Sequence, residues 1–205
     1  MRKKISILLA VIVWFSIVTQ LYLMMQNRTA SVTETIIRFF SFFTILTNIL
    51  AAIYFTREIF QQRTFSKHGT LTSITVYITI VGIVYQVLLR HVWHPTGMQM
   101  VVDELLHTIN PILVIIFWSV YEDKRSVRYK QTISWLLYPI LYLAYILIRG
   151  TFSGFYPYPF VDVAKIGLIK TLVNSGLLLL FFIVISLLFV LFGKKLFKKN
   201  IIRKG

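Results

Sequence analysis

The feature that most limits the fold of this chain is the recurrence of long apolar runs. The runs are about 20 residues long, which is what an α-helix needs to cross the hydrocarbon core of a bilayer. Because lipid offers no partner for backbone polar groups, such runs predict helices. We therefore predict an all-α polytopic membrane protein, a six-transmembrane-helix bundle that forms a single domain over residues 1–205. The predicted spans are residues 5–25, 37–56, 71–90, 104–121, 131–149 and 167–193.

The composition supports this class of protein. Only 14% of the residues are charged, whereas a soluble domain carries about 25%. The first segment begins with the basic sequence MRKK, as a signal peptide does, but its apolar stretch continues to Met25 without an A-x-A cleavage site. We therefore expect a retained first helix.

The basic residues predict the orientation of the bundle. Most of the 22 Lys and Arg residues precede the first span, follow the second and fourth spans, or belong to the C-terminal tail. Cytoplasmic loops carry the excess of basic residues, so both termini are predicted in the cytoplasm and the protein in the cell membrane. This pattern explains the net charge of +15 by topology, and the partner that we expect is membrane lipid, not nucleic acid. The sequence leaves the oligomeric state open.

Polar residues collect at the outer ends of the predicted spans. Polar groups in a bilayer are costly unless they face protein or water, so this pattern favours a cavity that opens outwards. Small and hydroxylated residues also line ordinary helix contacts, and the aromatic residues of the loop at 149–163 fit either a cap on the cavity or the headgroup layer. The strongly polar residues are Arg90, Asp103, Glu104, His107, Asn110, Arg149, Asp162, Lys170 and Asn174.

Thr44 and His107 are the candidate catalytic residues. At about 1.5 Å per residue, Thr44 lies roughly 9 Å below Arg38 and His107 roughly 6 Å below Asp103, which are comparable depths. A hydroxyl beside an imidazole can act as a nucleophile and its general base, and Asp103, one turn before His107, can orient the ring. Residue types alone leave open a packing or ion-path histidine.

Three motifs resemble the androgen-induced-gene-like family of multi-span membrane proteins and its bacterial relatives. They are FFTILTN at 42–48, DELLHTINPIL at 103–113 and RGTFSGFYPYPFVDV at 149–163. The resemblance implies a threonine nucleophile and a histidine that hydrolyse esters of fatty acids with hydroxy fatty acids. The histidine corresponds to His107 and the threonine to Thr44, with Thr47 as the competing alignment. The animal segment carries an acidic residue after the threonine, which is absent here.

The predicted function is therefore an intramembrane threonine/histidine hydrolase of acyl-lipid esters. The substrate-binding candidates are Asn48, Asn110 and Arg149, as donors to an oxyanion, together with Arg90. We expect no cofactor and no metal, because His91, His94 and His107 show no helical metal-binding spacing. The alternatives are a transporter or lipid-binding protein that recognises an anionic headgroup through arginines and Lys170, and a membrane protein without enzymatic activity.

Overall fold

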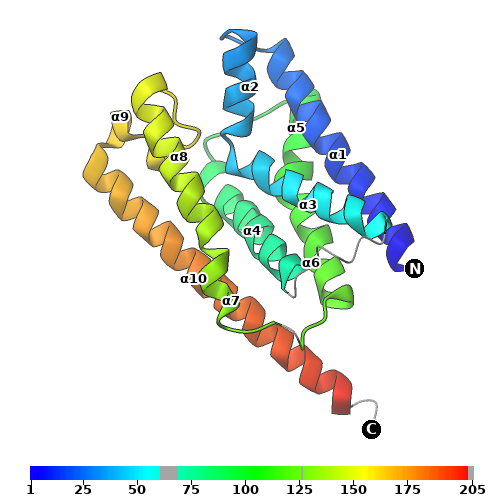
Figure 1. Ribbon diagram of the computed structural model, residues 1–205. Helices are drawn as coiled ribbons and strands as arrows, with labels where there is room; N and C mark the ends of the chain where they lie inside the picture. The colour runs from blue at the N-terminus through cyan, green and yellow to red at the C-terminus, as the bar shows by residue number, and fades with distance from the viewer. Residues whose placement is uncertain (61–68, 126, 203–205) are drawn as a thin grey trace.

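Helices make up all the regular structure in the described part of the chain, and no strand occurs there (Figure 1). The computed structural model describes residues 1–60, 69–125 and 127–202. Two π-helical turns, η2 (Tyr85–Leu89) and η3 (Leu105–Ile109), and one 3-10 turn, η4 (Pro159–Val161), interrupt the α-helices. The α-helices are α1 (Arg2–Gln26), α2 (Val32–Phe40), α3 (Phe43–Ile59), α4 (Thr70–Val84), α5 (Gly97–Glu104), α6 (Asn110–Tyr121), α7 (Gln131–Trp135), α8 (Leu137–Ser153), α9 (Val163–Ile166) and α10 (Leu168–Ile202).

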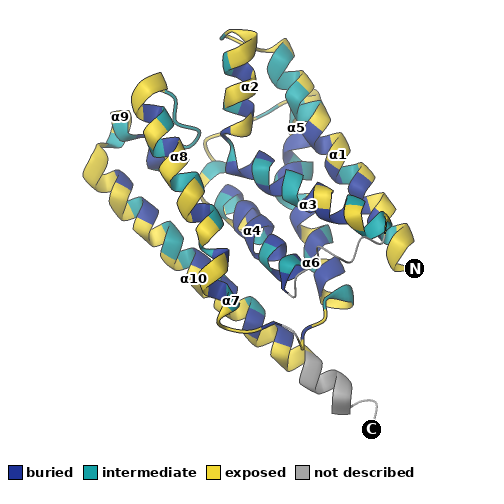
Figure 2. Cartoon of the chain, in the orientation of Figure 1, coloured by how far each residue is buried: buried dark blue, intermediate teal, exposed yellow. Residues whose placement is uncertain are grey.

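Five helical segments among the described residues are long and apolar enough to cross a membrane, and the bent pair α2 and α3 makes a sixth if it counts as one span. Helices α1, α8 and α10 carry many exposed residues, coloured yellow in Figure 2, and a large share of them are apolar. Exposed apolar surface on this scale fits lipid tails better than water. The chain is thus compatible with a multi-pass membrane protein. The five segments are Arg2–Gln26, Thr70–Leu89, Gly97–Tyr121, Gln131–Ser153 and Leu168–Leu196.

The centre of the bundle is formed by α3 and α4. Helix α1 packs along α3, and α4 contacts α3, α6 and α10. Phe55, Ile78 and Phe117 are buried where these helices meet. The start of α1 lies lower in Figure 1 than α2 and α9, which are at the upper side.

The predicted span at 37–56 is not one continuous helix. Helices α2 and α3 meet at a bend of 71°, because Ser41 donates a hydrogen bond back to the carbonyl of Ile37 (2.7 Å) and Phe42 adopts extended backbone angles. The prediction of a single helix was therefore wrong here. The sequence gives no sign of the break, because neither Pro nor Gly occurs at it. The bend places Thr44 in the first turn of α3, where backbone N–H groups have no partner within the helix.

The predicted span at 104–121 begins earlier than expected. Its helical segment starts at Gly97, so Asp103 lies about 9 Å inside the segment rather than at its entrance. Just before Pro111 the helix widens into the π turn η3, in which the N–H of Asn110 bonds the carbonyl of Leu105. His107 is therefore held in the widened turn in the middle of a long helical segment.

An amide network fixes α1, α3 and α6 relative to one another. Asn110 donates to the side-chain oxygen of Asn48 (2.9 Å) and to the hydroxyl of Ser16 (3.3 Å). Asn48 donates in turn to the carbonyls of Thr44 (2.9 Å) and Leu106 (3.4 Å). Both asparagines are completely buried, so the network positions the backbone behind the candidate catalytic residues.

Replacement of Asn110 by alanine is expected to lower the free energy of unfolding by about 1 kcal/mol, because it leaves a buried oxygen of Asn48 without its donor. The thermal midpoint of the purified protein in detergent micelles measures this change. Ser119→Ala is the matched control, since the Ser119 hydroxyl is exposed and bonds a carbonyl of its own helix. Equal midpoints for the two variants would show that the network contributes no stability.

Candidate active site

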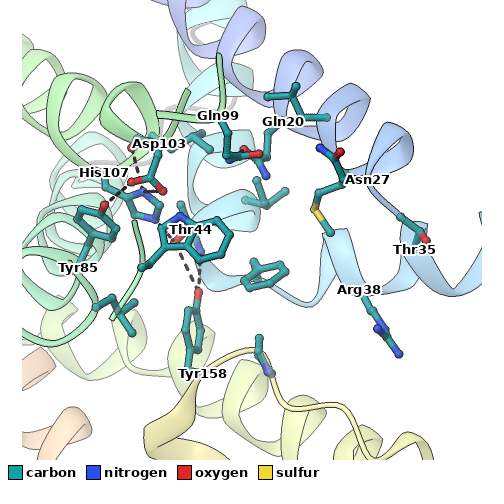
Figure 3. Close-up of a pocket in the computed structure, with 18 of the residues that line it drawn as sticks. Gln20, Asn27, Thr35, Arg38, Thr44, Tyr85, Gln99, Asp103, His107 and Tyr158 are labelled. Atoms are coloured by element: carbon teal, nitrogen blue, oxygen red, sulfur yellow. Dashed lines mark hydrogen bonds and ion pairs between the residues drawn. The ribbon is translucent and has the colours of Figure 1, made fainter. Parts of the chain in front are cut away.

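A cavity of about 700 Å³ lies beside the bend between α2 and α3. Its wall is built from the end of α1, the first turn of α3, the turns η2 and η3, helix α5 and the loop after α8 (Figure 3). This volume is typical of cavities that bind a small organic ligand. Most of the wall is apolar. Tyr85, Asp103 and Tyr158 lie around Thr44 and His107, whereas Asn27, Thr35 and Arg38 place polar groups on a more distant part of the wall (Figure 3).

The structure brings Thr44 and His107 together on the wall of this cavity. The Oγ1 atom of Thr44 lies 3.3 Å from Nε2 of His107, although the two residues come from α3 and η3. Thr47, the competing nucleophile, lies one turn further along α3. Its hydroxyl is completely buried, bonds the hydroxyl of Tyr138 (3.1 Å) and does not line the cavity. The geometry therefore favours Thr44 over Thr47.

Two oxygen atoms of Asp103 orient the ring of His107. Nδ1 of His107 lies 2.9 Å from the backbone carbonyl oxygen of Asp103 and 3.3 Å from its carboxylate. Two acceptors at Nδ1 favour the tautomer that carries its proton there, which leaves the lone pair of Nε2 facing the Thr44 hydroxyl. The arrangement suits Nε2 to receive a proton from Thr44.

Tyr85 supports this pair and was not identified from the sequence. Its hydroxyl donates a hydrogen bond to the carboxylate of Asp103. Its ring stacks on the imidazole of His107 with 4.1 Å between the ring centroids. Tyr85 belongs to η2 and His107 to η3, so the two π turns face each other. Gly82 permits this approach, because a Cβ atom there would lie 3.1 Å from the carbonyl oxygen of His107.

Tyr158 is the second residue that sequence reasoning missed. Its hydroxyl oxygen accepts a hydrogen bond from the backbone N–H of Thr44 (3.4 Å) and lies 3.5 Å from Oγ1 of the same residue. Its ring stacks on Phe160. Burial raises the pKa of the Tyr158 phenol above its ordinary value, so the hydroxyl keeps its proton at neutral pH. The only sequence signal was the aromatic loop as a whole.

That loop does line the cavity, which was one of its two predicted positions. Phe155, Pro157, Tyr158 and Pro159 contribute to the wall. The loop leaves α8 through Gly154, whose φ of +66° is in the left-handed region that favours glycine. The ring of Tyr156 packs so closely on Gly150 that a Cβ atom there would overlap it.

The four predicted substrate-binding residues do not line the cavity. Asn48 and Asn110 are completely buried behind Thr44, and their amides donate within the network described above. Arg90 pairs with Glu104, and Arg149 pairs with Glu34 (2.7 Å). Their positions provide no direct contact with a molecule in this cavity.

Other basic groups occupy the wall instead. Arg28 and Arg38 both line the cavity. Arg38 pairs with Glu34 (2.8 Å), whereas the described contact of Arg28 is with the carbonyl of Met25 (3.0 Å). Asp162 pairs with Lys165 (3.3 Å), three residues along the chain.

Two other histidines, His91 and His94, do not belong to the cavity wall. Both are exposed. Within the described residues, no group of three or more His, Cys, Asp or Glu side chains is arranged to hold a metal ion. The polar groups described around Thr44 are an imidazole, a carboxylate and two phenols.

Comparison with protein-family models, with curated proteins and with solved structures found no match for this chain.

Proposed function

We propose that this protein is an integral membrane hydrolase of acyl-lipid esters. Thr44 is the nucleophile, His107 the general base, and Asp103 positions His107. The observation that carries the proposal is the 3.3 Å contact between Thr44 and His107 on the wall of a cavity large enough for a lipid headgroup or chain. In this proposal the bent pair counts as one of six spans, both termini are cytoplasmic, and the protein lies in the cell membrane.

The reaction follows from the orientation of these groups. Oγ1 of Thr44 attacks the ester carbonyl carbon while Nε2 of His107 takes the hydroxyl proton, and the carbonyl oxygen becomes an oxyanion. The intermediate collapses to an acyl-threonine, and His107 gives the proton to the departing alcohol. Water then repeats the sequence, with His107 again as base, and releases the carboxylic acid.

Tyr158 is the best placed donor to the oxyanion. Because its oxygen accepts from the N–H of Thr44, its own proton remains available to donate. Thr44 also lies in the first turn of α3, where the helix dipole favours negative charge. This assignment replaces Asn48, Asn110 and Arg149, the donors expected from the sequence, whose side chains are occupied elsewhere.

The alternative of a transporter or binding protein for an anionic headgroup has less support. Arg90 and Arg149 are engaged by carboxylates, and neither these two residues nor Lys170 lines the cavity. Arg28 and Arg38 place positive charge on the wall, but they serve an anionic substrate of a hydrolase equally well.

Reaction with a fluorophosphonate probe tests the proposal. The purified protein in detergent is expected to form a covalent adduct, which peptide mass spectrometry places on Thr44. Thr44→Ala and His107→Ala lose the adduct, whereas Thr47→Ala keeps it because its hydroxyl lies outside the cavity. Absence of labelling in the wild type, together with absence of ester hydrolysis, would favour the binding or transport alternative.

Replacement of Asp103 by asparagine is expected to lower kcat by about 10- to 100-fold, the equivalent of one charge-assisted hydrogen bond. The decrease is limited because the backbone carbonyl of residue 103 still accepts from Nδ1 of His107 and preserves the tautomer. Steady-state hydrolysis of a 4-nitrophenyl ester measures the change. Glu104→Gln, at the neighbouring carboxylate that pairs with Arg90, is the control and is expected to leave kcat within about threefold.

A further inference from the structure

A second, narrower cavity meets the first at the candidate catalytic residues. It lies between α4, α8 and α10 and has a volume of about 80 Å³. Thr44, His107, Leu89 and Tyr158 line both cavities. A carbonyl carbon under attack by Thr44 would therefore have a separate space on each side.

Among the described residues that line the narrow cavity, none beyond those catalytic residues offers a free polar group. Its wall is formed by side chains such as Val81, Ile146 and Leu179. Of its two other hydroxyls, that of Tyr142 donates to the carbonyl of Ser41 (2.8 Å) and that of Ser175 to the carbonyl of Thr171 (2.7 Å). A polar group that entered this cavity would lose its hydrogen bonds to water and find no replacement there. The cavity therefore suits an alkyl group.

The two volumes differ by almost an order of magnitude. An engineered cavity of about 150 Å³ holds one benzene ring, so a cavity of about 80 Å³ has room for an arm of about three heavy atoms. The wide cavity, at about 700 Å³, has room for a lipid-sized group. Because protein interiors are densely packed, a long chain would fit in the narrow cavity only if the side chains of its wall were displaced.

From this pair of cavities we propose that the substrate is an ester with one short alkyl arm, held between α4, α8 and α10, and one long arm, held in the wide cavity. The inference rests on the proposed hydrolase function and names its substrate class. It differs from the esters of two long-chain acids that the family resemblance implies, because only one of the two spaces accommodates a long chain.

Three esters of matched chemistry test the substrate class. Hexadecyl acetate has a short acyl arm, ethyl hexadecanoate has a short alcohol arm, and hexadecyl hexadecanoate has two long arms. With the purified wild-type protein in detergent micelles, at least one of the two asymmetric esters is expected to be hydrolysed ten times faster than the symmetric one. Which of them is faster identifies the arm that occupies the narrow cavity.

Variants at Leu179 connect the preference to the narrow cavity. Leu179→Ala enlarges the cavity and is expected to raise the rate on hexadecyl hexadecanoate relative to the preferred asymmetric ester by at least fivefold. Leu179→Trp fills the cavity and is expected to lower the rate on the preferred ester tenfold, while fluorophosphonate labelling of Thr44 persists. Leu180→Ala, on the exposed side of α10, serves as the control and leaves the ratio unchanged.

The outcomes separate this inference from the function on which it rests. Equal rates on the three esters, or a ratio that no Leu179 variant alters, would overturn the short-arm site while the hydrolase stands. Failure to hydrolyse any of the esters, together with absence of labelling at Thr44, would overturn the hydrolase and the substrate class with it.

Discussion

Replacement of Thr44 by alanine is expected to lower kcat for an acyl ester by about 10⁴-fold or more, the scale seen when a hydrolase loses its nucleophile. Among the described residues, Thr44 carries the one hydroxyl that both lies on the cavity wall and is within hydrogen-bond reach of Nε2 of His107. Steady-state kinetics in detergent micelles measure the change. Thr44→Ser keeps a hydroxyl at this position. Its kcat is expected to stay within about tenfold of wild type, which corresponds to about 1.4 kcal/mol in activation free energy.

The same mechanism predicts that Thr44 and His107 act as one unit. The double variant Thr44→Ala/His107→Ala is expected to be no slower than either single variant, because residues of one catalytic unit are strongly non-additive. Thr47→Ala is the matched control, since its hydroxyl bonds Tyr138 away from the cavity. Multiplicative losses in the double variant, or an equal loss in Thr47→Ala, would contradict the assignment.

Replacement of Tyr158 by phenylalanine is expected to lower kcat by about 10²- to 10³-fold with little change in KM, as for the loss of one oxyanion donor. The phenylalanine ring keeps the stacking on Phe160 and the edge contact with Phe42, so the loop retains its packing. Only the hydroxyl near Thr44 is removed. Kinetics with a 4-nitrophenyl ester separate the effects on kcat and KM.

Tyr145→Phe controls for the loss of a tyrosine hydroxyl in the same region. The Tyr145 hydroxyl bonds that of Ser41 (3.1 Å) and does not line either cavity. We expect the kcat of Tyr145→Phe to be within about threefold of wild type, a change of less than about 1 kcal/mol in activation free energy. A rise in KM without a fall in kcat for Tyr158→Phe would assign Tyr158 to ground-state binding.

Much of the helix arrangement could be predicted because lipid imposes a length on each span. The apolar runs located the helices from Arg2–Gln26 to α10, but the depth of His107 reckoned from Asp103 did not hold, because the helical segment starts at Gly97. The break at Ser41 and Phe42 could not be predicted in this way. Both flanks favour helix, and the bend depends on a back-bonded hydroxyl and on packing from other parts of the chain.

The supporting residues of the site could not be predicted for a related reason. Tyr85 meets Asp103 across two helices, and Tyr158 meets Thr44 from 114 residues away. Tyr85 does not differ in its local pattern from Tyr138 or Tyr145, which have other partners, and Tyr158 is one of several aromatic residues in its loop. Only the tertiary fold distinguishes a tyrosine at the site from one in the surrounding helices.

The paired π turns make the site sensitive to the spacing of the chain as well as to its side chains. A π turn holds one residue more than the α turn it replaces. Deletion of one residue within Tyr85–Leu89 or Leu105–Ile109 would restore a regular helix with its flanks close to their present register, and would remove the widened turn that presents Tyr85 or His107. Tyr85 and His107 would then no longer stack, even with every atom of both rings intact.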